Sequence, residues 1–180
     1  EVSPAQRDAL DDQVKVPLVY ANVLLSNWHP WQRAGVHAIQ PIGGFWDEAA
    51  LDFPVSMGGI RFASAPDQPM LVHLAKVVVP LDGRPARTQA AAGRAQLDAW
   101  SFADFETRIA QLLQGALGRF GFAAGRDIEA ITVNRWAHGY AYEYMRPWDA
   151  FWPQGELPCF TARRGWGRVA IANADAGAYA

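Results

Sequence analysis

The chain has 180 residues, and a hydrophobic share of 51% with eight tryptophans indicates a folded protein with a substantial core. The formal net charge of −2, without a basic run, argues against a nucleic-acid surface as the main role of the chain. No apolar run approaches the roughly 20 residues of a transmembrane helix. The single Cys159 excludes an intrachain disulfide and a cysteine-rich metal site.

The first part of the chain is predicted to contain one short helix and two strands. Polar helix formers at Ser3–Asp12 indicate the helix. The nearly continuous apolar run of Val14–Leu25, VKVPLVYANVLL, predicts a strand buried on both faces. Pro17 within this run indicates either that the strand starts near this residue or that the strand lies at the edge of the sheet. Val36–Ile42 predicts a second short strand, whereas Phe45–Phe53 is aromatic, acidic and irregular, as is typical of a loop or hairpin.

The middle of the chain contains the clearest strand pattern, MLVHLAKVVV at Met70–Val79. His73 within it is flanked by apolar residues, and we expect a core histidine whose hydrogen bonds are satisfied. Leu81–Ala99 is rich in proline, glycine, arginine and alanine, which predicts a surface connection with one short helical turn.

The segment Ser101–Phe120 predicts an amphipathic helix that covers a sheet. Ser101 is placed to cap its start, Asp104 three residues later gives an approximate capping box, and Gly121 is placed to end it. The apolar stripe of this helix consists of Phe105, Ile109, Leu112, Leu113, Ala116, Leu117 and Phe120.

The stretch Ile131–Tyr144, ITVNRWAHGYAYEY, begins as a strand and then becomes aromatic. After Trp136 the aromatic residues occupy alternate positions, so an extended backbone would place Tyr140, Tyr142 and Tyr144 on one side. Three such rings can form the wall of a core, or the wall of a pocket for a flat or cationic ligand. The residues alone leave both alternatives open.

Near the carboxyl end, Arg168–Ala172 predicts a short strand that leads into Asn173, Asp175 and a helical start of small residues. Asp175 can cap that helix, or it can offer its carboxylate to a sugar hydroxyl at the end of the strand. Across the whole chain, strands and helices follow each other without a regular rhythm. The expected fold class is therefore α+β, a mixed or antiparallel sheet with covering helices on one side.

The run RWAHGYAYEY at 135–144, followed by GRVAIANADA at 167–176, resembles the carboxyl-terminal part of flavin-dependent amine oxidases. It is most similar to bacterial spermidine dehydrogenase-like proteins, and VKVPLVYANVLL resembles a strand of their substrate domain. The resemblance implies that residues 1–164 are mostly a substrate-binding domain. Residues 165–180 would be the last strand and the helix start of an FAD-binding α/β domain, so the chain would be part of a longer polypeptide.

The same resemblance implies roles for individual residues. Tyr140 and Tyr142 match the aromatic walls of the substrate channel, with Trp136 as a support and Glu143 as a carboxylate for the amine. The positions that match the ribityl side of the flavin are Asn173, Asp175 and Ala176. The G-x-G-x-x-G fingerprint that binds the dinucleotide is absent from the chain, so it would have to come from the rest of the polypeptide or from a companion chain.

The implied reaction oxidises an amine or a polyamine such as spermidine to an imine by hydride transfer to FAD. Some similar proteins are also associated with haem, but none of the four histidines has metal-ligand spacing and no haem-attachment motif is present. The family implies a bacterial protein and leaves open the periplasm or the cytoplasm. Two alternatives remain: a binding module rich in aromatic residues, and an amine-oxidase-like subunit without activity.

Overall fold

The computed structural model describes residues 2–52, 54–144, 149, 151–153 and 155–177. The chain divides into two compact units, which we describe separately. Unit 1 comprises Glu1–Val16, Val79–Gly93 and His138–Ala180, and unit 2 comprises Pro17–Val78 and Arg94–Ala137. The division at 164/165 that the resemblance implies stays a prediction.

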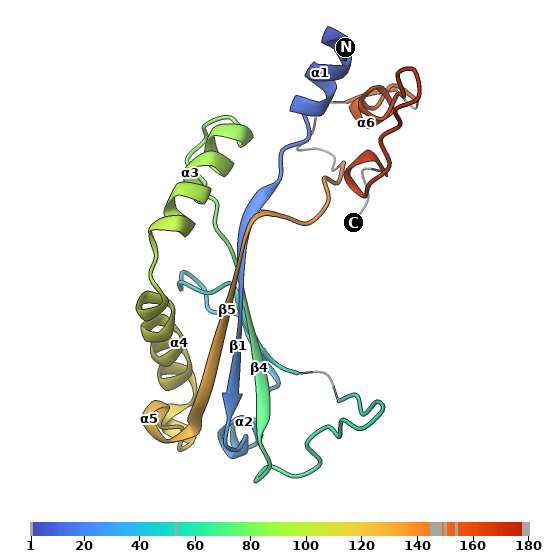
Figure 1. Cartoon of the computed structure of the whole chain (residues 1–180). Coiled ribbons are helices and arrows are strands. Elements are labelled where there is room, and N and C mark those ends of the chain that lie inside the picture. Colours follow the sequence, from blue (N-terminus) through green and yellow to red (C-terminus); the bar gives the residue numbers. More distant parts are fainter. Residues whose placement is uncertain (1, 53, 145–148, 150, 154, 178–180) are drawn as a thin grey trace. The chain divides into compact units, whose positions relative to one another are not determined.

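Unit 2 is built on a five-stranded antiparallel sheet with the strand order β2-β3-β4-β1-β5 (Figure 1). The α+β class is thus confirmed, although the sheet is antiparallel rather than mixed. The strands are β1 (Val16–Leu25), β2 (Ala38–Ile39), β3 (Glu48–Leu51), β4 (Met70–Val77) and β5 (Ile128–Gly139).

The predicted strands at Val14–Leu25 and Met70–Val79 are confirmed as β1 and β4, which pair with Asn22 opposite His73. Burial on both faces of β1 was wrong. Val19, Ala21 and Val23 are fully buried, while the residues between them are only half-buried. One face of β1 therefore faces the core, and the other lies on the open face of the sheet.

Helices cover the core face of this sheet (Figure 1). The longest is α4 (Phe102–Leu117), and its predicted capping box is present: the Ser101 hydroxyl accepts from the Asp104 N–H at 3.2 Å, and the Asp104 carboxylate accepts from the Ser101 N–H at 2.8 Å. The shorter helices of unit 2 are α2 (His29–Ala34), η1 (Gly118–Phe120) and α5 (Ala124–Asp127). The fully buried stripe of α4 consists of Phe105, Ile109, Leu113 and Leu117.

Of two predictions in the connecting regions, one was wrong and one was met in part. Leu81–Ala99 was expected to be a surface connection with one short helical turn, but it contains the 14-residue helix α3 (Ala86–Ala99). Its six alanines favour a helix more strongly than the single Gly93 opposes one. Phe45–Phe53 was expected to be a loop or hairpin, and it contains β3, which pairs antiparallel with β2. The EAAL sequence of β3 has weak strand propensity, and pairing with β4 also stabilises it.

Unit 1 contains the predicted amino-terminal helix, α1 (Pro4–Asp11), together with α6 (Pro158–Ala162) and the single turn η2 (Asp175–Gly177). Gln6 on α1 is buried, and its side-chain amide donates to the carbonyl oxygens of Ala162 and Arg164. This polar contact joins the first helix of the chain to a segment near its end.

The predicted strand Arg168–Ala172 was wrong. The backbone instead closes on itself in a tight turn, in which Trp166 and Val169 exchange two N–H···O bonds of 3.0 Å. Gly167 has a positive φ of 59°, which permits this reversal. Among the described residues, no helix is both long and apolar enough to cross a bilayer.

Candidate functional site

Three of the four residues predicted to bind substrate line one cavity in unit 1. This cavity has a volume of about 450 Å³. The charged and aromatic residues that line it are Asp12, Lys15, Tyr140, Tyr142, Glu143 and Asp149. The tyrosine stretch thus borders a cavity, and the role of that cavity as a ligand pocket stays a prediction.

The tyrosines reach this cavity by a different route from the one expected. β5 ends at Gly139, and Tyr140 has a positive φ of 50°, so the strand does not continue through Tyr144. The alternation that would put three rings on one side is broken at this point. Tyr140 is 65% exposed, Tyr142 is half-buried, and Tyr144 is not among the residues that line the cavity.

Tyr142 is kept neutral by its surroundings. Burial raises the pKa of Tyr142 to about 12, and the Asp149 carboxylate adds to the shift by its charge and by accepting a hydrogen bond from the phenol. The negative charge of Asp12 acts in the same direction. The phenol therefore stays a hydrogen-bond donor at physiological pH.

Asp175 connects three distant parts of unit 1. Its Oδ2 lies 2.9 Å from the Nζ of Lys15, and its Oδ1 accepts the backbone N–H of Tyr142 at 2.9 Å. Partial burial acts to raise the pKa of Asp175, but the bonds from Lys15 and Tyr142 outweigh it, and the net shift is downward. Asp175 is thus an ionised group held by a cation and a backbone donor.

The residues predicted to contact flavin make hydrogen bonds with other groups of the chain. Both carboxylate oxygens of Asp175 are already bonded within the chain. The N–H of Ala176 donates to the side chain of Asn173 at 2.9 Å, so Asn173, not Asp175, caps the turn η2. The Asp175 carboxylate and the Ala176 N–H thus have partners within the chain, and their role toward flavin stays a prediction.

Trp136, the fourth residue predicted for substrate, belongs to unit 2. It lies on β5 and is 55% exposed, and it is not among the residues that line the tyrosine cavity. Its role as a support for the substrate site stays a prediction.

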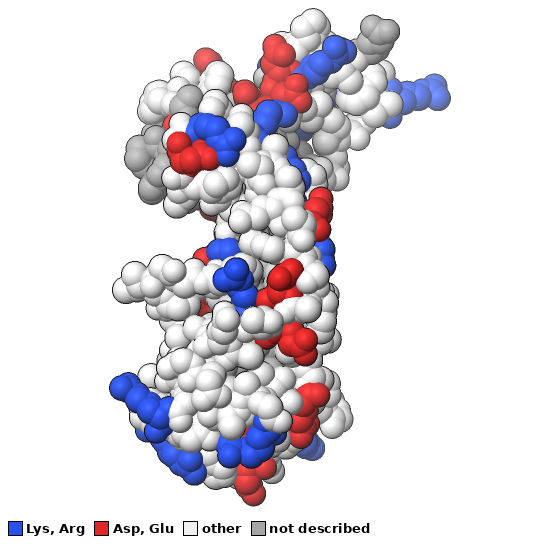
Figure 2. Space-filling view, turned by 90° about the vertical axis from the view of Figure 1, so that its left-hand side faces the viewer, with Lys and Arg blue, Asp and Glu red and all other residues white. Residues whose placement is uncertain are grey.

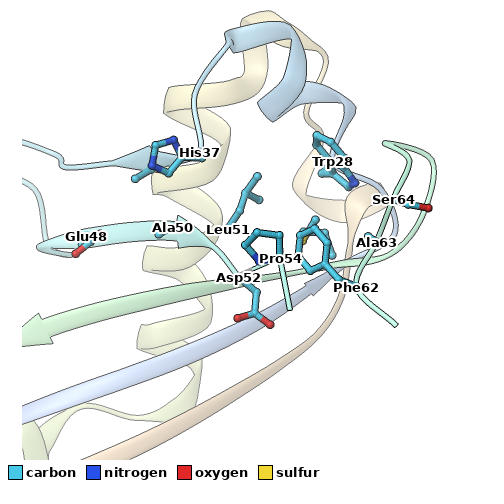
Figure 3. A pocket seen from close by; sticks show the side chains of 12 residues that line it. Trp28, His37, Glu48, Ala50, Leu51, Asp52, Pro54, Phe62, Ala63 and Ser64 are labelled. Carbon is cyan, nitrogen blue, oxygen red and sulfur yellow. The ribbon is translucent and has the colours of Figure 1, made fainter. Parts of the chain in front are cut away.

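Unit 2 has a larger cavity, of about 590 Å³, which the sequence did not predict (Figure 3). Its apolar wall is formed mainly by Trp28, Leu51, Pro54, Phe62 and Met70. These residues come from four separate segments of the chain, so no spacing pattern in the sequence connects them. The edge of the cavity carries the carboxylates of Glu48 and Asp52 and the imidazole of His37.

His73 was expected in the core, but its side chain is 47% exposed on the open face of the sheet. Its Nε2 lies 2.9 Å from Asp52, its Nδ1 contacts the side-chain oxygen of Asn22, and Asn22 reaches the hydroxyl of Thr132 at 3.4 Å. The strand alternation explains the error, because Val72 and Leu74 on either side of His73 take the core positions.

On the molecular face drawn in Figure 2, acidic and basic side chains are intermixed. Among the described residues, no group of three or more His, Cys, Asp or Glu side chains is arranged to hold a metal ion. The chain matches no protein-family model and no curated protein.

Proposed function

We propose that this chain forms the amine-binding part of a flavin-dependent oxidoreductase that oxidises an amine or a polyamine such as spermidine. The observation that carries the proposal is the convergence of Tyr140, Tyr142 and Glu143 on one cavity with two further acids, Asp12 and Asp149. The amine-oxidase resemblance points to the same tyrosines independently of the cavity.

The charges at the cavity suit a cation. Among the residues that the structure describes, three carboxylates line it together with the ammonium of Lys15, which contacts the carboxylate of Asp175. An organic amine would therefore enter a region of negative potential, while an anion would be repelled. The faces of Tyr140 and Tyr142 add a cation–π attraction, which is strongest where water is excluded.

The chain's own part in the proposed reaction is to bind and orient the amine. Asp149 holds the Tyr142 phenol by a hydrogen bond, and the Tyr142 backbone is held by Asp175. Both contacts fix the position of the ring before the ligand arrives, which lowers the entropic cost of binding. The flavin would be held in part by residues outside these 180, because the dinucleotide fingerprint is absent from the sequence.

The oxidative step is tested on the native protein, purified from its source cells together with any chain that copurifies with it. The proposal predicts a visible flavin band at about 450 nm that bleaches when spermidine is added without oxygen. A colourless preparation that still binds spermidine would instead favour an aromatic-rich binding module. That second candidate is supported by the engagement of Asp175 and Ala176 within the chain.

A further inference from the structure

The cavity of unit 2 has no part in the function proposed above. Its volume of about 590 Å³ falls within the range of small-molecule sites. Figure 3 shows the rings of Pro54 and Phe62 beside each other below the indole of Trp28, with Leu51 next to them. Two aromatic rings, a proline ring and an aliphatic side chain thus face a common space.

The aromatic wall is held by hydrogen bonds that do not involve a ligand. The Nε1 of Trp28 donates to the carbonyl oxygen of Ala65 at 3.0 Å, and its backbone N–H donates to Pro66 at 2.9 Å. The N–H of Phe62 donates to the hydroxyl of Ser56 at 2.9 Å. Because its only polar atom is bonded, the Trp28 side chain offers a ligand its apolar ring.

The charged groups of the cavity lie at its edge. In Figure 3 the carboxylate of Asp52 points away from the rings, and it contacts His73 at 2.9 Å. Glu48 lies at the opposite end of the cavity from Trp28 and Phe62. A charged group of either sign seated between the rings would therefore lose its hydration without gaining a close ion partner from these carboxylates, which disfavours a charged ligand.

We infer that this cavity binds an uncharged aromatic molecule of one or two fused rings. Such a ligand buries its apolar surface against Leu51 and Met70. It also stacks offset or edge-on against Trp28 and Phe62, the arrangements that aromatic rings prefer. The site is separate from the amine cavity and stands whether or not the amine is bound there.

Three ligands that share one ring system test the inference: neutral indole, cationic tryptamine and anionic indole-3-acetate. In calorimetric titrations of the full chain, we expect indole to bind. In NMR spectra of the same titration, we expect indole to shift the Trp28 Nε1–H resonance. Tryptamine should displace indole no more effectively than indole itself, and indole-3-acetate should be weaker. No indole binding at millimolar concentration, or tighter binding of either charged ligand at this cavity, would overturn the inference.

Variants locate the binding. Phe62→Ala should weaken indole roughly tenfold by removing one stacking partner and its buried area. Ala63→Trp, which introduces a bulky ring into the lining, should abolish binding. Phe102→Ala is the control, because Phe102 is a 49% exposed phenylalanine on α4 away from the lining. Equal losses in Phe62→Ala and Phe102→Ala, or full affinity in Ala63→Trp, would contradict the assignment.

Discussion

Lys15 and Asp175 are 160 positions apart in the sequence, and the Nζ of one lies 2.9 Å from the Oδ2 of the other. Both side chains are mostly buried, with 28% and 20% of their surface exposed. Asp175 uses its second oxygen to accept the Tyr142 N–H. One carboxylate therefore joins the segment after α1, the tyrosine stretch and the turn η2.

This contact predicts that Asp175→Ala destabilises the fold by roughly 1–2 kcal/mol, because a charge-assisted bond and a backbone partner are lost together. Asp175→Asn keeps an acceptor for the Tyr142 N–H and should lose less. Denaturation gives the free energies of unfolding of both Asp175 variants, of Lys15→Met and of the corresponding double variant. These values together give the coupling free energy between Lys15 and Asp175. Asp8→Ala, on an exposed position of α1, is the control. Additive effects of the two substitutions at Lys15 and Asp175 would show that the contact contributes nothing.

The engagement of Asp175 also predicts that the chain does not bind FAD by itself. Its carboxylate and the Ala176 N–H already have partners, and the dinucleotide fingerprint is absent. Titration of FAD with the chain should leave flavin fluorescence without a saturable change. Saturable quenching that Asp175→Ala removes would show that this carboxylate exchanges Lys15 for the flavin.

Asp127 in unit 2 predicts a loss of stability in acid. The Arg126 guanidinium and the Ala123 N–H bond to its buried carboxylate and hold its pKa below the ordinary 3.8. A carboxyl group whose folded pKa is lowered stabilises the fold above its unfolded pKa, and this stability is lost as the pH falls through the folded pKa. Urea denaturation should show that the free energy of unfolding falls between about pH 5 and pH 2. This fall should be smaller by about 1 kcal/mol in Asp127→Asn than in the parent. A variant as acid-sensitive as the parent would contradict this account.

The core of unit 2 predicts a large cost for removing the ring of Phe105. This side chain is fully buried and contacts the rings of Phe45, Trp46 and Trp100, with centroids 5.8–6.3 Å apart. Phe105→Ala should lower the free energy of unfolding by about 3–5 kcal/mol. Phe102→Ala, one helical turn earlier and half-exposed, should cost much less in the same denaturation series.

The parts of the fold that could be predicted are those whose information is local. The capping box at Ser101 and the stripe from Phe105 to Leu117 are read within one helix, and both are present. The strand Arg168–Ala172 failed because apolar residues form a strand only beside another strand, and here the backbone turns back on itself. Within the expected loop or hairpin, the EAAL strand β3 was not singled out for the converse reason, since pairing with β4 supplies what its composition lacks.

The same distinction applies to the sites. Tyr140, Tyr142 and Glu143 are neighbours in sequence, so their shared place at a cavity could be predicted. Lys15 could not be, because nothing in its surroundings indicates a partner 160 residues away. The cavity around Trp28 and Phe62 was equally hidden, because its walls come from separate segments that only the folded chain brings together.

The most direct test of the amine site is a calorimetric titration of spermidine into the chain and into two tyrosine variants. Tyr142→Ala keeps the backbone N–H that binds Asp175 but removes the ring, so affinity should fall about thirtyfold, the equivalent of about 2 kcal/mol for a desolvated cation–π contact. Tyr144→Ala, two residues away and outside the lining, should bind as the parent does. If spermidine does not bind the parent, or if both variants lose the same affinity, the cavity is not an amine site.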